Sequence, residues 1–333
     1  MGNTTSQKPI AITPGDPAGI GSEITLKAHH AGIRGFFAIN DVAYLESVSQ
    51  SIGITSKFRQ IDTPLEFDPN SASLQVLPIK WAETPVAGAP SQANANTVIK
   101  SIEASASWAQ DGLCSAIVTN PIAKATLYDA GFKHPGHTEF LGSMSPKTPG
   151  APMMMLACDA LRVVPLTVHI PLNEVAATLT TQNIIEAGRL LATNLTKFFG
   201  IQSPRLAICG LNPHAGEGGT MGREDLDVIA PAIKQLRAEG ITAFGPMPAD
   251  TMFHAAARET YDAVLGMYHD QVLIPLKTID FFGGVNVTLG LDFIRTSPDH
   301  GTGFDIAGKG VANPDSLIAS IKMAKAMAAT LAK

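Results

Sequence analysis

Three short apolar runs in the second half of the chain each end close to a histidine. Residues 163–168, 206–211 and 263–268 lead to His169, His214 and His269. Short apolar runs bounded by Gly, Pro or Asn are typical of buried strands in a parallel sheet, and the carboxyl ends of such strands line a ligand crevice. One such histidine alone would be an ordinary polar residue. Three imidazoles there can bind one divalent metal and leave a position open for substrate or water, so we predict a metal or catalytic site.

Apolar runs alternate with amphipathic stretches along the whole chain, and its 333 residues leave room for two domains. This alternation favours an α/β fold with a mainly parallel sheet. We expect a helix to begin near Ser22, and we interpret residues 84–96 as a loop or hairpin rather than a domain linker. Further strands are predicted at 9–13, 36–39, 74–79 and 116–119, and further helices at 94–110, 182–199, 223–239 and 314–332.

Charge and composition exclude several classes of function. The net charge is −5 and Lys and Arg are not clustered, which counts against binding to nucleic acid. The longest apolar stretches, such as residues 153–157, are far too short to cross a membrane. Cys114, Cys158 and Cys209 lack CxxC spacing, as is typical of reduced intracellular thiols, and the N-terminus carries no secretory signal. We therefore expect a cytoplasmic protein with no nucleic-acid or membrane partner.

Two glycine-rich segments are candidates for binding a phosphate-bearing cofactor. Gly216–Gly222 misses the G-x-G-x-x-G spacing by one residue, so a Rossmann fold is not supported, and this loop is either a tight turn or a ligand loop. Residues 299–314 combine glycines that can expose backbone N–H groups with an imidazole, carboxylates and an ammonium. This segment resembles the adenine-nucleotide loop of the isocitrate and isopropylmalate dehydrogenases, which bind NAD(P) without a Rossmann fingerprint.

The resemblance to these dehydrogenases implies both a fold and a cofactor. The implied fold is α/β of the isocitrate/isopropylmalate dehydrogenase type, with two α/β/α domains flanking a central cleft. The implied cofactor is NAD or NADP, and the sequence leaves the choice open because the selecting residue lies outside any recognisable motif. The loop residues that the resemblance assigns to cofactor binding are His300, Gly301, Thr302, Asp305 and Asn313.

Further motifs narrow the resemblance to one family. The segments GDPAGIG, PGHTEF, NPHAGEGG and YHDQ, which begin at residues 15, 135, 212 and 268, are similar to signatures of the 4-hydroxythreonine-4-phosphate dehydrogenases of vitamin B6 synthesis. Residues 283–291 and 293–297 complete the set, and the order of the motifs is kept from Ile10 to the C-terminus. The resemblance implies a homodimer whose active site draws on both subunits. It also implies one domain of residues 1–140 with 296–333, and a second of residues 141–295.

The resemblance assigns binding roles to particular residues. The metal ligands of the family match His169, His214 and His269, a set that suits Zn, Co, Mn or Mg to differing degrees. Its substrate-binding pair matches His137 and Thr138, and its phosphate and carboxylate contacts match Lys277, Asn286 and Arg295. Such cations can neutralise an anionic substrate, here a phosphorylated hydroxy-amino acid.

The acid or base of the reaction stays open between two aspartates. Asp270, next to a ligand histidine, can orient an imidazole or accept a proton, and Asp250 is the second candidate. Lys124 can also reach the site, although a lysine on the surface of a helix is the simpler interpretation.

The implied reaction is oxidation of 4-(phosphooxy)-L-threonine by NAD(P) to 2-amino-3-oxo-4-(phosphooxy)butanoate, which loses carbon dioxide to give 3-amino-2-oxopropyl phosphate. A paralogue acting on 4-phosphoerythronate or D-4-phosphothreonate is the main alternative. Such relatives carry a longer insertion between the helix with Lys277 and the next strand, whereas only residues 278–284 separate Lys277 from Val285 here. A protein that binds metal and nucleotide without catalysis is a more distant alternative, because it would have no need for the whole set of residues.

Overall fold

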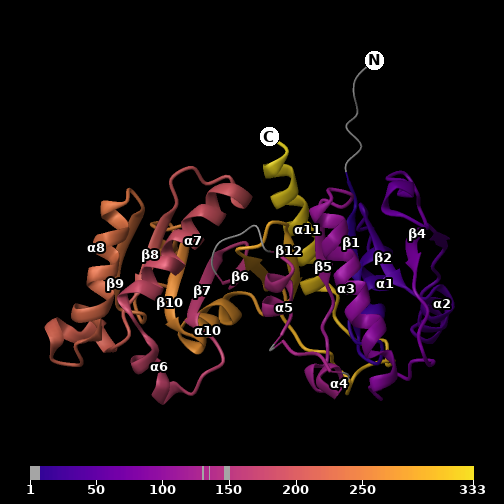
Figure 1. Cartoon of the computed structure of the whole chain (residues 1–333), viewed down its shortest axis with the longest axis horizontal. Coiled ribbons are helices and arrows are strands. Elements are labelled where there is room, and N and C mark those ends of the chain that lie inside the picture. The colour runs from indigo at the N-terminus through magenta and orange to yellow at the C-terminus, as the bar shows by residue number, and fades with distance from the viewer. Residues whose placement is uncertain (1–7, 130, 135, 146–150) are drawn as a thin grey trace. The chain divides into compact units, whose positions relative to one another are not determined.

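The structure, a computed structural model, describes residues 8–129, 131–134, 136–145 and 151–333. The chain divides into two compact units (Figure 1): unit 1 comprises Met1–Thr148 and Leu291–Ala329, and unit 2 comprises Pro149–Gly290 and Thr330–Lys333. These boundaries differ from the predicted ones at residues 140 and 296. Arg295 therefore lies in unit 1, because it is the first residue of a strand that pairs with the sheet of that unit.

Unit 1 is built on a parallel sheet. Its strands, in spatial order, are β3 (Phe58–Gln60), β4 (Leu74–Pro78), β2 (Phe36–Asn40), β1 (Ile10–Thr13), β5 (Ala116–Thr119) and β12 (Arg295–Pro298). Each neighbouring pair within this order is parallel. The four strands predicted in the first half of the chain are therefore confirmed, with ends within one residue of those expected.

Helices cover both faces of the sheet of unit 1. The described helices are α1 (Gly21–His30), α2 (Val42–Ser51), α3 (Ala95–Gln110), α4 (Lys124–Asp129), α5 (His137–Ser143) and α11 (Asp315–Leu331), with 3₁₀ turns η1 (Pro64–Glu66) and η2 (Gln92–Asn94). Ala11, Phe37 and Ile117 point to one face and share a core with the apolar side of α3. Thr296 points to the other face, where its hydroxyl donates a 3.0 Å hydrogen bond to the carbonyl of Ser320 in α11.

Unit 2 is built on a sheet that is mainly parallel, as predicted. Its strands, in spatial order, are β11 (Val285–Leu289), β6 (Met153–Cys158), β7 (Leu161–Thr167), β10 (Ala263–Tyr268), β8 (Arg205–Cys209) and β9 (Thr242–Met247). β6 runs antiparallel to β11 and β7, and the strands from β7 to β9 are parallel. The three apolar runs that precede the histidines are thus neighbouring strands, and their carboxyl ends meet at one edge of the sheet.

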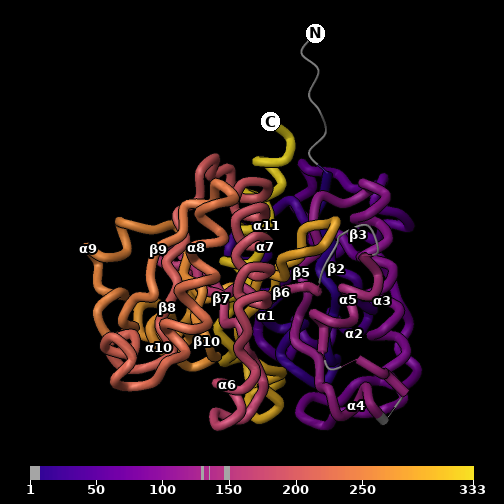
Figure 2. Tube along the Cα trace, turned by 60° about the vertical axis from the view of Figure 1, so that its left-hand side comes forward, coloured from indigo at the N-terminus to yellow at the C-terminus, as the bar shows by residue number. Residues whose placement is uncertain are grey.

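The sheet of unit 2 also lies between two layers of helices. Its described helices are α6 (Leu172–Thr178), α7 (Thr181–Phe199), α8 (Ala230–Ala238), α9 (Ala255–Arg258) and α10 (His269–Ile279), with a 3₁₀ segment η3 (Pro213–Gly219). Val163, Ala207 and Val264 stand side by side and pack in one core with Leu276 of α10. α7 and α8 lie next to each other (Figure 2) and pack on strands of the same sheet. The predicted α/β/α layering is therefore confirmed in each unit.

The helix expected over residues 223–239 is confirmed, with an irregular first part. Asp225–Ile229 form a π-helical turn, and α8 starts only after it. Pro231 lies in the first turn of α8 and has no backbone N–H to donate, so the regular hydrogen-bond pattern cannot continue backwards through this position. The acidic side chain of Asp225, in this π-helical turn, faces the loop that precedes it, which is described below with the site.

Three smaller expectations are also answered. Val86 and Ala89 form an antiparallel bridge, so the segment 84–96 contains the hairpin-like turn that was one interpretation. Cys114, Cys158 and Cys209 are buried free thiols. Among the helices of the described residues, none is both long and apolar enough to cross a membrane.

His29 makes the stability of unit 1 dependent on pH. It is 8% exposed in α1, its ring stands edge-on to Phe36, and burial lowers its pKa from 6.5 to about 4. Between these values the unfolded chain binds a proton that the folded chain does not, so stability falls as the pH drops below about 6.5, by at most about 1.4 kcal/mol per pH unit. We expect His29→Gln to reduce this dependence in urea unfolding at pH 7.5 and 5.0. His30→Gln, at the exposed neighbour in the same helix, should leave the slope as it is; equal slopes for all three proteins would contradict the prediction.

Candidate active site

Two of the three predicted metal ligands lie together in unit 2. His169 follows β7 after Val168, and His269 opens α10 directly after β10. Because the two strands are parallel neighbours, their rings come within 5.9 Å of each other between centroids, at an interplanar angle of 38°. A metal lies about 2 Å from a ligating imidazole nitrogen, so two rings on one ion have centroids on the order of 5–6 Å apart. The spacing of this pair fits one shared ion.

The ring of His269 is held by its neighbour. Its Nδ1 lies 2.7 Å from Oδ1 of Asp270, which is exposed in the first turn of α10. A carboxylate that accepts from Nδ1 fixes the tautomer and directs Nε2 toward a ligand, an arrangement found around many metal-binding histidines. Asp270 is therefore placed to orient His269. Asp250, the other aspartate candidate, is exposed in the turn after β9.

His214 occupies an unusual backbone conformation. It begins six consecutive residues with positive φ, namely His214 (52°), Ala215 (51°), Gly216 (79°), Glu217 (41°), Gly218 (64°) and Gly219 (96°). A left-handed conformation costs roughly 1–2 kcal/mol for each residue with a side chain, so three such residues in one turn store strain. Strain of this kind persists only where the surroundings fix the backbone.

Asp225 supplies that support. It is fully buried at the start of the π-helical turn, and its carboxylate accepts hydrogen bonds from the backbone N–H of Leu211 at 2.9 Å and of Asn212 at 3.2 Å. The side-chain amide of Asn212 donates to Oδ2 of Asp225 at 2.9 Å and to Glu224 at 2.8 Å. The glycine-rich segment that follows is therefore a tight turn that Asp225 holds in place.

The third histidine does not complete a metal cage within this chain. Nδ1 of His214 lies 3.3 Å from Oε2 of Glu217, and both side chains are exposed. In the part of the chain that the structure describes, no three side chains of His, Cys, Asp or Glu are grouped closely enough to hold a metal ion. His169 and His269 thus form a pair, and His214 stands apart from it.

His137 is one of the expected substrate residues that lie in unit 1. This residue opens α5, and its Nε2 is buried without a hydrogen-bond partner among the described residues. Burial, followed by the positive charges of Arg295 and Lys124, lowers the pKa of His137 well below its usual value of 6.5. The ring is therefore neutral at pH 7. Lys124 is exposed at the start of α4, as expected of a surface lysine, but its side chain also lies against Gly136, beside His137.

Arg295 is a buried cation. It is 3% exposed, and burial lowers the pKa of its guanidinium from 12.5 to about 9. Its Nε and Nη2 both donate to Oγ1 of Thr119, at 3.1 and 2.7 Å. The guanidinium of Arg295 stays protonated at neutral pH. Burying its positive charge costs free energy, so binding of an anion next to it would be strongly favoured.

The remaining substrate residues are spread over both units. Thr138 follows His137 in α5 of unit 1 and is partly buried. Lys277 lies in the last turn of α10 in unit 2, with its ammonium 5.7 Å from the centre of the Phe281 ring. Asn286 is the second residue of β11 and is partly buried.

The predicted cofactor loop of unit 1 lies against the amino end of α1. The N–H of Ile20 donates to the carbonyl of Thr302 at 2.9 Å, and a Cβ added at Gly19 would lie 2.7 Å from that carbonyl oxygen. Only glycine allows this approach. His300 points its Nδ1 at the carbonyl of Gly301, 2.9 Å away, and its Nε2 is buried without a partner among the described residues.

An ion pair of α1 fixes the far end of this loop. Nζ of Lys27 lies 2.8 Å from Oε1 of Glu23 and donates to the carbonyls of Gly310 at 2.9 Å and Ala312 at 2.7 Å. The same carboxylate oxygen accepts from the N–H of Ala312 at 2.9 Å, and Glu23 is 2% exposed. We call this arrangement the loop clamp. Asp305 and Asn313, two of the predicted cofactor residues, are exposed on the loop that it holds.

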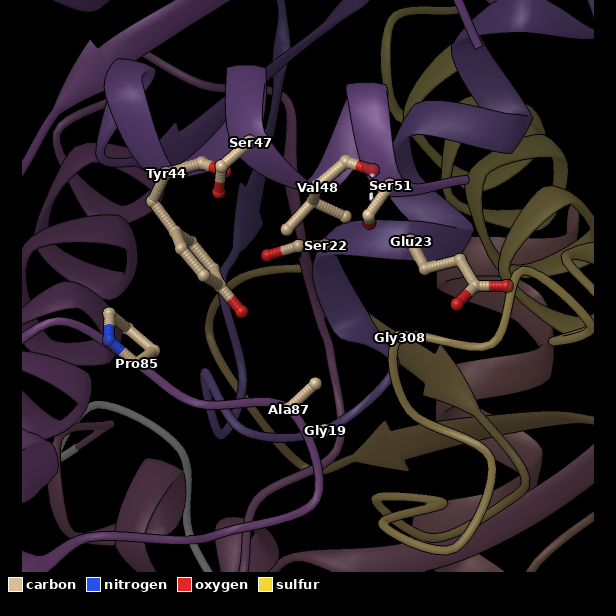
Figure 3. Close-up of a pocket in the computed structure, with 10 residues that line it drawn as sticks. All are labelled: Gly19, Ser22, Glu23, Tyr44, Ser47, Val48, Ser51, Pro85, Ala87 and Gly308. Carbon is tan, nitrogen blue, oxygen red and sulfur yellow. Dashed lines mark hydrogen bonds between the residues drawn. The ribbon is translucent and has the colours of Figure 1, made fainter. Parts of the chain in front are cut away.

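A pocket of about 300 Å³ lies behind the loop clamp. Figure 3 shows its walls, which come from α1, α2, residues 85–87 and Gly308. The hydroxyls of Ser47 and Ser51 donate to carbonyls of their own helix, and that of Tyr44 donates to the carbonyl of Pro17. The pocket therefore presents mainly acceptor oxygens and a small apolar wall, and it separates α2 from the cofactor loop.

The sequence did not predict several contacts that position the candidate site residues. Thr119 is visible in the sequence as the last residue of a predicted strand, but its contact with Arg295 depends on a pairing across 176 residues. The loop clamp of Glu23 and Lys27 depends on contacts across more than 280 residues, and Asp225 depends on contacts with Leu211 and Asn212, 14 and 13 positions away. Glutamate and lysine four residues apart are a common surface pair on helices, so that spacing alone gave no signal.

The loop clamp leads to a test on the protein without ligands. Lys27→Met keeps the length of the side chain but removes all three of its hydrogen bonds, so amides of residues 310–313 should exchange about tenfold to a hundredfold faster. Glu23→Gln keeps an acceptor for the N–H of Ala312 and should have a smaller effect. Hydrogen–deuterium exchange followed by mass spectrometry measures both; unchanged exchange of this segment in Lys27→Met would show that the loop holds itself.

Known proteins resemble this chain closely. Residues 34–324 match the family described as "Pyridoxal phosphate biosynthetic protein PdxA". The 4-hydroxythreonine-4-phosphate dehydrogenase of Methylorubrum populi is 48% identical over 335 residues, covering 97% of this chain and 95% of the relative. The enzyme of the same name from Caulobacter vibrioides is 50% identical over 331 residues, covering 97% and 98%.

A solved structure agrees with the sequence relatives. The crystal structure of 4-hydroxythreonine-4-phosphate dehydrogenase from Klebsiella pneumoniae has a TM-score of 0.90 and 36% identity, covering 98% of this chain and 99% of that one. The family match spans most of the chain, and the relatives are similar over nearly their whole length. The chain therefore belongs to the family of the pyridoxal phosphate biosynthetic 4-hydroxythreonine-4-phosphate dehydrogenases, as its motifs predicted.

Proposed function

We propose that this chain oxidises 4-(phosphooxy)-L-threonine with NAD(P), giving 2-amino-3-oxo-4-(phosphooxy)butanoate, which then loses carbon dioxide to give 3-amino-2-oxopropyl phosphate. Family membership supports the reaction class. The main support for the proposal is in unit 1, where a neutral His137 lies near the buried, positively charged Arg295. Production of NADH or NADPH from this substrate by the purified protein is the direct test.

His137 and Arg295 have complementary roles in this proposal. Arg295 binds an anionic group of the substrate, and its planar fork suits a phosphate or carboxylate better than a point charge would. His137, kept neutral by its surroundings, orients a substrate hydroxyl or amine through a ring nitrogen, and Thr138 acts beside it. Lys277 and Asn286 bind anionic groups of the same substrate.

A divalent metal fits the residues of unit 2. Two imidazoles lie at a distance suited to one ion, and one of them is oriented by a carboxylate. A bound divalent ion, for which Zn, Co, Mn and Mg are the candidates, supplies positive charge that lowers the pKa of a substrate hydroxyl. Asp270 holds His269 in the ligating tautomer, and either Asp270 or Asp250 accepts the proton of the substrate hydroxyl.

The loop from His300 to Asn313 is proposed to bind NAD or NADP. The roles fall to His300, Gly301, Thr302, Asp305 and Asn313. The loop clamp supports this assignment, because a nucleotide site requires a loop whose backbone groups are fixed before the ligand arrives. Nε2 of His300 has an unused acceptor position that suits an N–H or O–H donor of the cofactor. A cofactor held by these residues would supply the acceptor for the hydride that leaves the substrate carbon.

We propose that the active enzyme is a homodimer in which the partner subunit's His214 joins His169 and His269. The separation of His214 from the other two within one chain supports this arrangement. The supported, strained turn also favours it, because such a turn can present His214 outward in one fixed direction. In a two-fold dimer each chain then completes the site of the other.

The first prediction for this site concerns the histidines. His169→Ala, His214→Ala and His269→Ala should each abolish turnover and leave the circular dichroism spectrum unchanged, because the loss of one of three ligands greatly weakens metal binding. Metal content measured after dialysis should fall in all three variants. Full activity of the wild-type protein in metal-free buffer with EDTA would exclude the metal.

Mixtures of these inactive variants separate a shared site from a site within one chain. A heterodimer of His169→Ala and His214→Ala contains one intact site if His214 serves the partner, so a random mixture should recover about a quarter of wild-type activity. The matched control is His169→Ala mixed with His269→Ala, which should recover none, because both of these ligands belong to the same chain. Equal recovery in the two mixtures would contradict the proposed division of ligands.

The second prediction concerns the substrate anion. Arg295→Ala or Lys277→Ala removes charge-assisted hydrogen bonds worth roughly 1.5–3 kcal/mol each, so the substrate KM should rise about tenfold to a hundredfold. The KM for the cofactor should change little, since the cofactor is assigned to another loop. Arg295→Lys should recover only part of the loss. A rise in the cofactor KM alone would show that the anion and nucleotide sites are assigned the wrong way round.

A further inference from the structure

The hydroxyl of Thr119 in unit 1 is the acceptor of two hydrogen bonds from one buried arginine. Oγ1 of Thr119 accepts two hydrogen bonds from the same guanidinium, from Nε of Arg295 at 3.1 Å and from Nη2 at 2.7 Å. Thr119 is 0% exposed and Arg295 is 3% exposed. Water therefore has no access to replace either bond, and the hydroxyl determines where this edge of the guanidinium lies.

The sheet explains why this pair meets. β12 runs parallel to β5, with Arg295 opposite Ile117 and Thr296 opposite Val118. Side chains two residues apart on a strand point to the same face of the sheet. Thr119 lies two residues after Ile117, the partner of Arg295, so it stands on the same face as Arg295 and nearer the carboxyl end of β5. The side chain of Arg295 runs toward that end, where the last residue of β5 receives it. The contact follows from the strand register and does not rely on a loop.

The geometry of a guanidinium determines what this contact achieves. The group is planar and has two edges that can each make a pair of parallel hydrogen bonds: the Nε–Nη2 edge and the Nη1–Nη2 edge. Thr119 holds the first edge and so constrains the plane of the guanidinium. The second edge is the one suited to a two-bond contact with a carboxylate or phosphate.

We propose that Thr119 is the positioning residue of the substrate-binding arginine, and that its hydroxyl aims the Nη1–Nη2 edge of Arg295 at an anionic group of the substrate. This inference rests on the proposal that Arg295 binds such a group. Thr119 itself does not touch the substrate. Its contribution is to keep the fork in the bound orientation before the anion arrives, so that binding does not have to order a long side chain.

The neighbouring strand offers a matched control. Thr13 is the last residue of β1, pairs directly with Thr119 across the parallel ladder, and is also 0% exposed. Its Oγ1 has no hydrogen-bond partner among the described residues. Thr13→Val and Thr119→Val therefore make the same chemical change at the same level of the sheet, and only the second removes an acceptor from Arg295.

The experiment measures substrate KM, cofactor KM and kcat for Thr119→Val, Thr119→Ser and Thr13→Val. Thr119→Val leaves two buried donors of Arg295 without an acceptor, and the substrate KM should rise about tenfold, with the cofactor KM unchanged. Thr119→Ser keeps the oxygen and should stay within about threefold of wild type. Thr13→Val should resemble wild type in all three constants. If Thr119→Val does not fold, Thr119→Cys replaces it, because a thiol is a much weaker acceptor.

A double-mutant cycle with Arg295→Lys separates positioning from a general effect on packing. Lysine has no planar fork to orient, so adding Thr119→Val to Arg295→Lys should raise the substrate KM less than about twofold. If Thr119 only supports the sheet, the same tenfold rise appears in both backgrounds. Thermal unfolding of each variant shows whether a change in KM merely follows a loss of stability.

Each outcome has a separate meaning. A substrate KM that is unchanged in Thr119→Val, or raised equally in Thr119→Ser or Thr13→Val, overturns the positioning role. If Arg295→Ala itself leaves the substrate KM unchanged, the fault lies in the proposed substrate site and not in Thr119. A loss confined to Thr119→Val and absent from the Arg295→Lys background supports the inference.

Discussion

The pairing of β7, β10 and β8 in one parallel register fixes where the chemistry of unit 2 can take place. Val264 lies between Val163 and Ala207. β7 and β10 end opposite each other at Thr167 and Tyr268, and β8 ends two residues earlier at Cys209. The residues that follow them must therefore appear along one edge of the sheet. The pairing of β7 with β10 is sufficient to bring His169 and His269 together there. His214 is different because a strained turn, and not the strand itself, sets its direction.

In unit 1, strand register likewise brings side chains together, here Thr119 and Arg295. The ends of β1 and β5 bring Thr13 and Thr119 to one level, and β12 adds Arg295 beside them. A cation so thoroughly removed from water is costly, which is consistent with the anion site that we propose beside it. The neutral state of His137 follows from the same burial and from the nearby positive charge.

Much of this arrangement could be predicted from the sequence, and the exceptions share one cause. The strand ends, the helix 182–199 and the α/β layering follow from local apolar patterns, because the apolar residues of each pattern are the ones that the core buries. The helix expected over 223–239 is confirmed, but its first part is a π-helical turn that the apolar pattern did not predict, and the buried Asp225 in that turn binds the preceding loop. The interactions that hold Arg295 and the cofactor loop join residues more than 170 positions apart, and no local pattern encodes such contacts.

The loop clamp shows what such distant contacts do for the loop that we propose binds the cofactor. Residues 310–312 are held by Glu23 and Lys27, which lie in the helix that begins directly after the glycine-rich turn GDPAGIG. The same turn presents the N–H of Ile20 to the carbonyl of Thr302, so the two ends of the loop are tied to one helix. A loop tied at both ends loses little further freedom when a nucleotide binds. The motif that identified the family is therefore also the part of unit 1 that gives its cofactor loop a defined shape.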